Sequence, residues 1–459
     1  MTVATEIAGR LGEAVGAKRV VAAEEELAAY AVDGLAPSAI VKPISPEEAA
    51  EVVRFAVAEK LALLPLGSKS KCDLGMTPER YDIAVDMTGL RSIAHFDPGD
   101  LTLSVDAGLP LRELDSFVRQ HGQFLPLAVP CFESTTAGGT IASGIDSALR
   151  LQYGFARDFL IGAEFIDGTG QLCKSGGRVV KNVTGYDLHK LLIGSSGTLG
   201  IITRLNFRTF PLPATFGGHL CSFNAIEGAL EYRKSAENAG LPLANLELLS
   251  PKLGKIICAV LEKAGQPHAP ELEQQHDWLV YSSFDGNEEV VRRIGHELKT
   301  IALETGAVNN RILEAGEDLS LGGMLRESFE WLRWASPATV ICRLPLPEMT
   351  AATLAQLFHL AESEALRSAL LVRTAGIVYF AVFADAKTDR VAEQLTKVVG
   401  GARSIAQTEQ ASCALLHAPP AIKKAATTNA MADLRLQQSV KRAFDPSNVF
   451  APGRVVGGI

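Results

Sequence analysis

Three glycine-rich segments lie in the first half of the chain, and their composition suits the binding of a phosphate group. They are residues 67–71 (GSKSK), 135–144 (TTAGGTIASG) and 194–202 (GSSGTLGII). Glycine lets backbone N–H groups approach an anion without a Cβ in the way, and Ser and Thr hydroxyls add donors. One such segment is more often a tight turn between packed elements. Three of them favour a dinucleotide, because a pyrophosphate needs donors that converge from several loops.

The best-known nucleotide motifs are missing. The G-x-G-x-x-G pattern of a Rossmann site does not occur where a strand meets a loop, and the chain has no G-x-x-x-x-G-K-[ST] phosphate loop. NAD binding of the usual kind and ATP hydrolysis therefore lose support. The seven cysteines are scattered and never form a C-x-x-C pair, which argues against a zinc site, an iron–sulfur cluster or a disulfide framework.

Composition places the chain among ordinary globular proteins. Its 459 residues are 47% hydrophobic and 21% charged, with a net charge of −8, and this length predicts two or three domains. The sequence has no concentrated run of Lys or Arg, which a nucleic-acid-binding protein would need. The first residues (MTVATE) lack the features of a secretory signal, and apolar runs such as 376–384 are too short to cross a bilayer. We expect a cytoplasmic protein that can dock on another component at a membrane.

Patterns in the N-terminal part predict elements that flank the glycine-rich segments. A capping box at Ser45 and Glu48, with proline at the first helical position, predicts a helix over residues 46–60. Residues 61–66 should form a strand that leads into Gly67. Further expected elements are strands at 85–87, 93–96, 101–105 and 200–210, a helix at 111–120 and a hairpin at 165–173.

Beyond Pro213 the pattern changes to strand-helix-strand-strand units, which predicts a separate α+β domain. Strands are expected at 220–223, 245–249, 255–261, 278–283, 339–344, 370–372 and 377–383. Helices are expected at 226–239, 288–303, 349–365 and 389–398. This order suggests an antiparallel sheet with helices on one face. The chain closes with a helix over 431–444 and a turn-rich tail.

The order of motifs resembles the FAD-binding domain of the vanillyl-alcohol oxidase (PCMH) type. The motifs are PLGSKS (65–70), the pair Gly138 and Gly139, G-x-x-R-D (154–158), KNVTGYD (181–187), GSSGTLGIIT (194–203) and the closing FDPxxVFxPGR (444–454). Within that superfamily the chain is similar to the FAD-binding subunits of bacterial glycolate oxidase. The likeness is strongest over residues 64–213 and the last 25 or so, and residues 181–203 are its most specific part.

The resemblance implies an α+β protein with a bipartite FAD-binding domain. Residues 1–213 and 425–459 would form this domain, and residues 214–424 an α+β cap whose antiparallel sheet is covered by helices. The expected cofactor-binding residues are Gly67, Ser68, Lys69, Ser70 and Lys71 in the first loop; Thr135, Thr136, Gly138, Gly139, Ser143 and Gly144 in the second; Ile161, Gly162, Gly200, Ile201 and Ile202 on the adenosine side; and Arg454 from the tail.

Two departures from the family pattern affect the expected chemistry. The usual first loop, Arg-Gly-Gly-Gly-Thr, is replaced by LGSKS at 66–70, where Lys69 or Lys71 can offset phosphate charge. Hydroxy-acid dehydrogenases of the superfamily carry a His-x-Gly-Asp-Gly-Asn-x-His segment that supplies a metal and a base. The comparable residues here, 372–379, read VRTAGIVY. No metal is therefore expected, and the catalytic base is unknown.

Two single residues are candidates for chemistry. Arg343, on a predicted cap strand, can pair with a substrate carboxylate or take part in a structural ion pair. Cys131 can anchor a flavin covalently or be a plain buried thiol. Because no histidine lies in 67–71, where relatives place a covalent flavin link, we expect FAD to be held non-covalently.

Three functions remain open at this stage. The first, implied by the resemblance, is an FAD-binding subunit of a glycolate oxidase complex. Its partners would be a catalytic flavin subunit and an iron–sulfur subunit that passes electrons to a membrane acceptor. The second is a self-sufficient flavin dehydrogenase for a small 2-hydroxy acid. The third is a non-redox scaffold with a vestigial flavin site.

Overall fold

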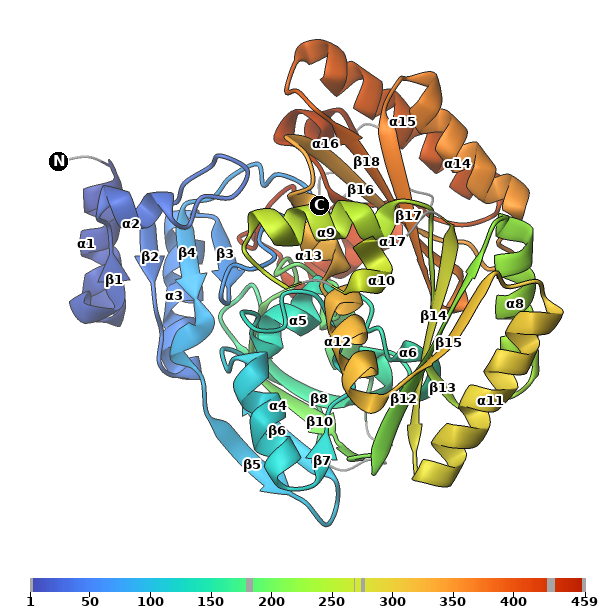
Figure 1. Ribbon diagram of the computed structural model, residues 1–459. Coiled ribbons are helices and arrows are strands. Elements are labelled where there is room, and N and C mark those ends of the chain that lie inside the picture. Colours follow the sequence, from blue (N-terminus) through green and yellow to red (C-terminus); the bar gives the residue numbers. More distant parts are fainter. Residues whose placement is uncertain (1–2, 179–184, 268, 274–276, 427–433, 456–459) are drawn as a thin grey trace.

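The structure is a computed structural model that describes residues 3–178, 185–267, 269–273, 277–426 and 434–455. Most of the KNVTGYD motif lies outside these ranges. The described residues form sheets of four, five, two and eight strands. In Figure 1 the four-stranded sheet and its helices lie at one side of the molecule and the eight-stranded sheet at the other. Within the same ranges, no helix is long and apolar enough to cross a membrane.

The four-stranded sheet delivers the first glycine-rich loop. Its helix α3 (Pro46–Glu59) begins as predicted, because the Glu48 N–H donates to the Ser45 Oγ at 3.1 Å. Strands β2 and β3 both run parallel to β4, so β3 ends at the sheet edge from which Gly67 continues. The strand order is β1-β2-β4-β3, with β1 (Val20–Val21), β2 (Ala39–Val41), β3 (Leu63–Leu66) and β4 (Ile83–Asp86).

The five-stranded sheet carries the second and third loops. It is antiparallel, in the order β5-β6-β10-β8-β9. Helices α4 and α5 bury Leu114 and Ile141 against its Val105 and Leu205. The predicted helix at 111–120 is confirmed as α4 (Leu111–Gln120), and the predicted strands as β5 (Ile93–Asp97), β6 (Thr102–Asp106) and β10 (Ile201–Arg208). The predicted hairpin is formed by β8 (Leu160–Ile166) and β9 (Leu172–Gly176). Helix α5 (Ala137–Ser143), inside the second glycine-rich segment, is not predicted by the sequence.

The eight-stranded sheet is antiparallel, in the order β15-β12-β14-β13-β17-β18-β16-β19. Its strands are β12 (Thr215–Phe223), β13 (Leu243–Leu249), β14 (Trp278–Gly286), β15 (Asn309–Leu313), β16 (Ala338–Pro345), β17 (Arg367–Arg373), β18 (Ile377–Ala384) and β19 (Ala414–His417). One face packs against the predicted helices α8 (Ile226–Asn238), α11 (Glu288–Glu304), α14 (Ala351–Ser363) and α15 (Asp389–Thr408).

Two expectations for this region are wrong. Helices lie on both faces of the sheet, because α9 (Leu253–Lys263), α12 (Ala315–Arg326) and α13 (Ser328–Arg333) cover the second face. The predicted strand at 255–261 is part of α9. Its apolar run suits a strand as well as a helix, but Leu253, Ile257 and Leu261 recur every four residues and are all buried.

The C-terminal tail returns to the four-stranded sheet. Helix α17 (Leu434–Phe444) ends before a segment whose Val449 carbonyl accepts from the Leu63 N–H at 2.7 Å. Asp445, fully buried, accepts from Lys441 Nζ at 2.6 Å and from the Phe450 N–H at 2.8 Å. The remaining elements are α1 (Val3–Val15), α2 (Glu24–Ala28), β7 (Gln123–Phe124), α6 (Arg150–Tyr153), α7 (Ala156–Phe159), β11 (Phe210–Pro211), α10 (Pro270–Glu273), α16 (Pro420–Ala426) and four short 3₁₀ turns.

The buried pair of Asp445 and Lys441 generates a stability prediction. Asp445→Asn keeps the shape but leaves a buried ammonium without its counter-ion, which costs about 3–5 kcal/mol. We expect a lower urea midpoint for unfolding. The control is Asp385→Asn, whose pair with Arg367 lies on the surface and should leave the midpoint unchanged. Equal midpoints for the two variants would contradict a structural role for the tail.

Candidate functional site

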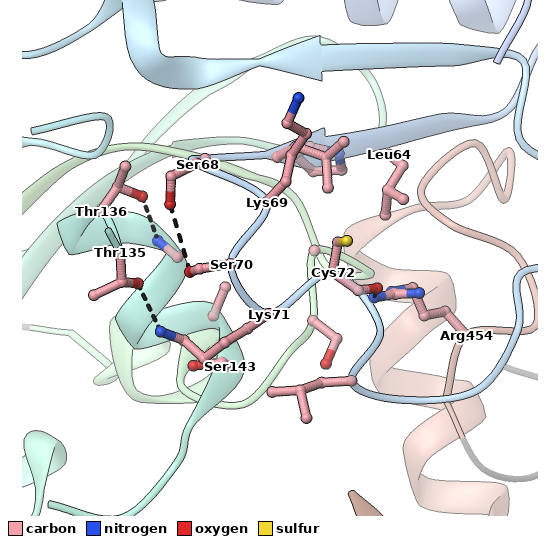
Figure 2. Close-up of a pocket in the computed structure, with 18 residues that line it drawn as sticks. Leu64, Ser68, Lys69, Ser70, Lys71, Cys72, Thr135, Thr136, Ser143 and Arg454 are labelled. Atoms are coloured by element: carbon pink, nitrogen blue, oxygen red, sulfur yellow. Dashed lines mark hydrogen bonds between the residues drawn. The ribbon is translucent and has the colours of Figure 1, made fainter. Parts of the chain in front are cut away.

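The three glycine-rich loops meet around one open cavity (Figure 2). With the solvent at its open mouth included, the larger hollow has a volume of about 520 Å³. A second hollow of about 380 Å³ adjoins it and shares part of its wall. The shared wall residues come from all three loops and the strand before the first: Pro65, Leu66, Gly67, Thr136, Gly139, Ala142 and Gly197. The sequence therefore predicts correctly that these distant segments converge.

The loops lie too close together for side chains at several glycines. A Cβ on Gly67 would lie 2.2 Å from the Thr136 Oγ1, and one on Gly197 would lie 3.0 Å from the Pro65 ring. The third loop is tied to α5, because the Ser196 N–H donates to the Ala142 carbonyl at 2.8 Å. These contacts form a cradle of backbone and hydroxyl groups.

The paired glycines of α5 have different surroundings. The Thr136 Oγ1 caps the helix by accepting from the Gly139 N–H at 3.2 Å. A Cβ on Gly138 would lie 2.9 Å from the Ala107 carbonyl oxygen, so this glycine packs against the five-stranded sheet. Gly139 lines both hollows and has only threonine hydroxyls near its Cβ position. Gly138 thus serves mainly the packing of α5, and Gly139 the cavity.

The two lysines of the first loop point in different directions (Figure 2). Lys69 Nζ lies 3.6 Å from the centre of the Tyr30 ring, away from the other cavity side chains. Lys71 is buried, and its Nζ donates to the Thr135 Oγ1 at 2.7 Å and to the Pro130 carbonyl at 3.2 Å. Burial lowers the pKa of Lys71 to about 8. Lys71 is therefore the cation positioned inside the cavity.

Arg454 brings a second buried cation to the cavity wall. Its guanidinium donates to the carbonyls of Cys72 and of Met76, the latter at 3.4 Å, while its Nε has no partner. Burial lowers its pKa. Among the described residues, no carboxylate lies within 4 Å of Arg454 or Lys71. Two buried cations without carboxylate partners, a glycine cradle and hydroxyl donors fit the pyrophosphate and ribityl parts of FAD.

Most of the predicted site residues line the cavity. These are Gly67, Ser68, Lys69, Ser70, Lys71, Thr135, Thr136, Gly138, Gly139, Ser143, Gly200, Ile202 and Arg454. Four others line neither hollow. Gly144 ends α5 beside Ser143, Ile201 belongs to the core beneath the four-stranded sheet, and Ile161 and Gly162 lie within β8, where Gly162 pairs with Asn206 of β10.

Arg343, on β16 of the eight-stranded sheet, lies beside the end of α5. Its guanidinium lies 3.6 Å from the Asp146 carboxylate and donates to the Gly144 carbonyl at 3.5 Å. Asp146 is buried and also pairs with Arg150 at 2.9 Å, while the Tyr379 hydroxyl lies 3.4 Å away. One of the two roles predicted for Arg343, a structural ion pair, is therefore present. The sequence does not predict a role for Asp146, although this residue follows the second glycine-rich segment by two positions.

A second charged cluster joins the first loop to the cap. The Asp73 carboxylate lies 2.9 Å from His417 Nδ1 and 2.5 Å from the Arg333 guanidinium. Arg333 also donates to the Ser70 carbonyl at 3.2 Å. Burial alone raises the pKa of Asp73, but the hydrogen bond from His417 and the charge of Arg333 outweigh it and bring the value to about 2. No spacing in the sequence signals this long-range cluster.

Cys131 lies beside the same cluster. Its thiol is 3.1 Å from a Glu330 carboxylate oxygen, and its N–H donates to the Glu327 carboxylate at 2.6 Å. Burial raises the pKa of Cys131 to about 12. This environment opposes formation of the thiolate that a covalent flavin link requires.

Family models match the first two glycine-rich loops and the tail that carries Arg454. Residues 37–176 match the model of an FAD binding domain, and residues 417–455 match that of the C-terminal domain of FAD linked oxidases. The first model spans the first and second loops, and the second ends one residue beyond Arg454. The chain therefore carries an FAD-binding domain, and FAD is the cofactor that its cavity fits.

Curated relatives include subunits and dehydrogenases. The chain is 36% identical over 166 residues to the glycolate oxidase subunit GlcE of Escherichia coli (strain K12), which covers 36% of this chain and 46% of that protein. It is 26% identical to the glycolate oxidase subunit GlcD of Bacillus subtilis (strain 168), over 66% of this chain and 64% of that protein. The chain thus spans less than two thirds of both subunits. A D-lactate dehydrogenase of Archaeoglobus fulgidus is 25% identical, with 91% of both chains covered.

Solved structures establish the fold. p-Cresol methylhydroxylase with substrate bound superposes with a TM-score of 0.77 at 17% identity, covering 99% of this chain and 96% of that one. Alkyldihydroxyacetonephosphate synthase superposes with a TM-score of 0.71 at 16% identity, over 97% and 84% of the chains. The expected PCMH-type α+β fold is confirmed.

The contrast between the paired glycines generates a prediction. Gly139→Val places a branched side chain in the cavity, so we expect FAD affinity to fall by at least about tenfold, with circular dichroism unchanged. Gly138→Val drives a Cβ into the Ala107 backbone, so we expect loss of soluble protein. Affinity is measured by titrating flavin-free protein with FAD. Normal flavin content in Gly139→Val would mean that this glycine does not face the cofactor.

The different orientations of Lys69 and Lys71 generate a second prediction about FAD binding. Lys71→Met removes a buried cation from the cavity, so FAD affinity should fall by about tenfold or more, whereas Lys69→Met should change it little. Because the pKa of Lys71 is lowered to about 8, the wild-type affinity should decline as the pH rises above 8. The affinity of Lys71→Met should stay flat over the same range. A matching decline in that variant would rule out Lys71 as the titrating group.

Proposed function

We propose that this chain is the FAD-binding subunit of a glycolate oxidase (glycolate dehydrogenase) complex that oxidises glycolate to glyoxylate. The observation that carries the proposal is the cavity with two buried, carboxylate-free cations, in a chain related to glycolate oxidase subunits. Bound FAD supplies a two-electron acceptor. Its partners would be a catalytic flavin subunit and an iron–sulfur subunit that passes the electrons to a membrane acceptor.

The proposed domain division follows the cavity. Residues 1–213 and 425–459 would form the FAD-binding domain, and residues 214–424 the cap that carries the substrate or partner surface. Lys71 and Arg454 would neutralise the pyrophosphate, and Gly139 would allow the cofactor to approach the backbone. Ile161, Gly162 and Ile201 would act behind the adenosine side. FAD would be held non-covalently, since residues 67–71 contain no histidine and Cys131 is a poorly ionised thiol.

Arg343 is the proposed receptor for a substrate carboxylate. It is one third exposed, stands beside the end of α5, and pairs only loosely, at 3.6 Å, with Asp146. Arg150 holds the same Asp146 at 2.9 Å, so this carboxylate stays compensated when Arg343 turns to a ligand. A planar guanidinium binds a carboxylate through two parallel hydrogen bonds. This arrangement supports a small 2-hydroxy acid as the substrate.

A self-sufficient dehydrogenase is the second candidate. The likeness to a D-lactate dehydrogenase over 91% of both chains favours it. Against it stands the lack of the His-x-Gly-Asp-Gly-Asn-x-His segment, which leaves no histidine base at residues 372–379. A scaffold with a vestigial flavin site is the third, and the intact cradle of glycine and hydroxyl groups argues against it.

Anaerobic mixing of the isolated holoprotein with glycolate or D-lactate tests the proposal. Positioned acid–base groups typically contribute about 10²–10⁴-fold in rate, so flavin bleaching by the lone chain should be slower than in ordinary dehydrogenases by a factor of this order. Reconstitution with its partner subunits should restore the rate. Fast bleaching by the lone chain would establish the self-sufficient enzyme instead.

Replacing Arg343 tests the substrate carboxylate. In the reconstituted complex, Arg343→Lys keeps the charge but loses the bidentate contact, and Arg343→Met loses both. We expect KM to rise about tenfold in the first and about a hundredfold in the second, with FAD content unchanged. Arg367→Met, at a surface ion pair, is the control. Unchanged KM in Arg343→Met would leave this residue as a purely structural partner of Asp146.

A further inference from the structure

We propose that a second cavity, between the eight-stranded sheet and the FAD-binding part of the chain, binds a small organic ammonium compound with an apolar body. With the solvent at its open mouth included, this cavity has a volume of about 820 Å³, and it is bounded by β12, β13, β14, α12 and residues 119–149. It shares no wall residue with either hollow of the cofactor cavity. It is therefore a separate site.

The inner wall presents hydrogen-bond acceptors in excess. Asp285, Asp318 and Asn245 are 9%, 4% and 3% exposed, and the Asn245 Oδ1 has no partner. Tyrosine hydroxyls donate to both carboxylates at 2.7 Å, Tyr153 to Asp285 and Tyr281 to Asp318. The Gln152 side-chain amide also donates to Asp285, at 3.2 Å. These donors are all neutral and leave the negative charges uncompensated. In the described part of the chain, no cationic side chain lies within 4 Å of either carboxylate. Buried carboxylates are costly without a positive partner, so the wall favours a cationic donor.

The charge of Asp285 acts on Asp318. Burial raises the pKa of Asp318 to about 6, and the negative charge of Asp285 adds to the shift. A ligand that brings a positive charge between them removes this repulsion. Asn245 belongs to the same wall, because it pairs in register with Ser283 on β14, two residues before Asp285.

The cavity also has two arginines in its wall, and each already has a partner. Arg119 Nε donates to Asp115 at 2.6 Å. Arg326 Nε donates to Glu327 at 3.2 Å, and its guanidinium lies over the Phe132 ring. Neither arginine neutralises the inner carboxylates. The two arginines add positive charge elsewhere in the wall, and they do not supply the cationic donor that Asp285 and Asp318 lack.

The rest of the wall determines what kind of cation fits. It is mostly apolar, with Leu319 59% exposed; the apolar wall residues are Phe124, Ala128, Ala148, Leu149, Phe216, Ala244, Phe284 and Leu319. Hard metal ions prefer six or more oxygen ligands, and within the described ranges no group of three or more His, Cys, Asp or Glu could hold one. A primary ammonium group has three N–H donors: it can fill the unpartnered Asn245 Oδ1 and bring a positive charge to the two carboxylates. An apolar body on the same compound suits the remaining wall.

Two substitutions separate the charge of the site from its volume. Asp318→Asn removes one negative charge and keeps an oxygen for the Tyr281 hydroxyl. Gly323→Leu on α12 fills the cavity, since nothing lies within 4 Å of a Cβ at this wall position. The control is Glu297→Gln, at a surface pair with Arg293 on α11. Flavin content and circular dichroism verify that each variant is folded.

The test is calorimetric titration of the full chain, with its flavin, with 2-phenylethylammonium. Neutral 2-phenylethanol and anionic 3-phenylpropanoate are the comparison probes. We expect saturable binding of the ammonium compound, at least about tenfold weaker binding of the other two, and at least about tenfold weaker ammonium binding in Asp318→Asn and Gly323→Leu. Glu297→Gln should bind like the wild type. Absence of ammonium binding, equal binding of the alcohol, or equal affinity in folded Asp318→Asn and Gly323→Leu would overturn the proposal.

Discussion

The carboxylate of Asp73 fixes the relation between the cofactor cavity and the cap. It belongs to the first loop, whereas its partners His417 and Arg333 belong to β19 and α13. Its low pKa, about 2, means that it stays charged at every pH at which the protein is expected to work. Since Arg333 also holds the Ser70 carbonyl, the loop that lines the cavity cannot shift without disturbing the cap. The shape of the cofactor cavity therefore depends on a contact made outside the FAD-binding part of the chain.

The cofactor cavity and the second cavity differ in the sign of their buried charges. In the described part of the chain, no carboxylate lies within 4 Å of the two buried cations of the cofactor cavity, Lys71 and Arg454. Likewise, no cationic side chain lies within 4 Å of the two buried carboxylates of the second cavity, Asp285 and Asp318. The buried carboxylate of Asp146 differs from these groups, because Arg150 and Arg343 both lie within 4 Å and neutralise its charge. A buried charge without a counter-ion is expensive to keep. Unmatched charges of opposite sign in separate cavities are best explained by ligands of opposite charge, an anion in one and a cation in the other.

Much of this site could be predicted from the sequence because its chemistry is local. The glycine, serine and threonine content of the three loops predicts phosphate binding without knowledge of where the loops lie in the fold. The capping box at Ser45 predicts the start of α3 in the same way, from neighbouring residues alone. The orientation of Lys69 and Lys71 could not be predicted, since it depends on Tyr30 and Thr135 from other segments. The same holds for Asp73 and Asp146, whose partners lie far away in sequence. The apolar run at 255–261, which lies in α9, does not distinguish a strand from a helix, because a continuous apolar stretch suits both a buried strand and a buried helix.

The dispersal of the cavity along the chain has a thermodynamic consequence. Its wall combines residues 64–74, 135–143 and 196–202 with Arg454, so no single segment forms the site alone. The tail that carries Arg454 is secured by Asp445 and Lys441 and by hydrogen bonds to Leu63. A ligand that binds only the assembled cavity stabilises all of these contacts together, by an amount that grows with the logarithm of its concentration. FAD binding and the packing of the tail are therefore thermodynamically linked. A substitution that weakens the contacts of the tail should lower the affinity for FAD, and one that lowers the affinity should make the tail less stable.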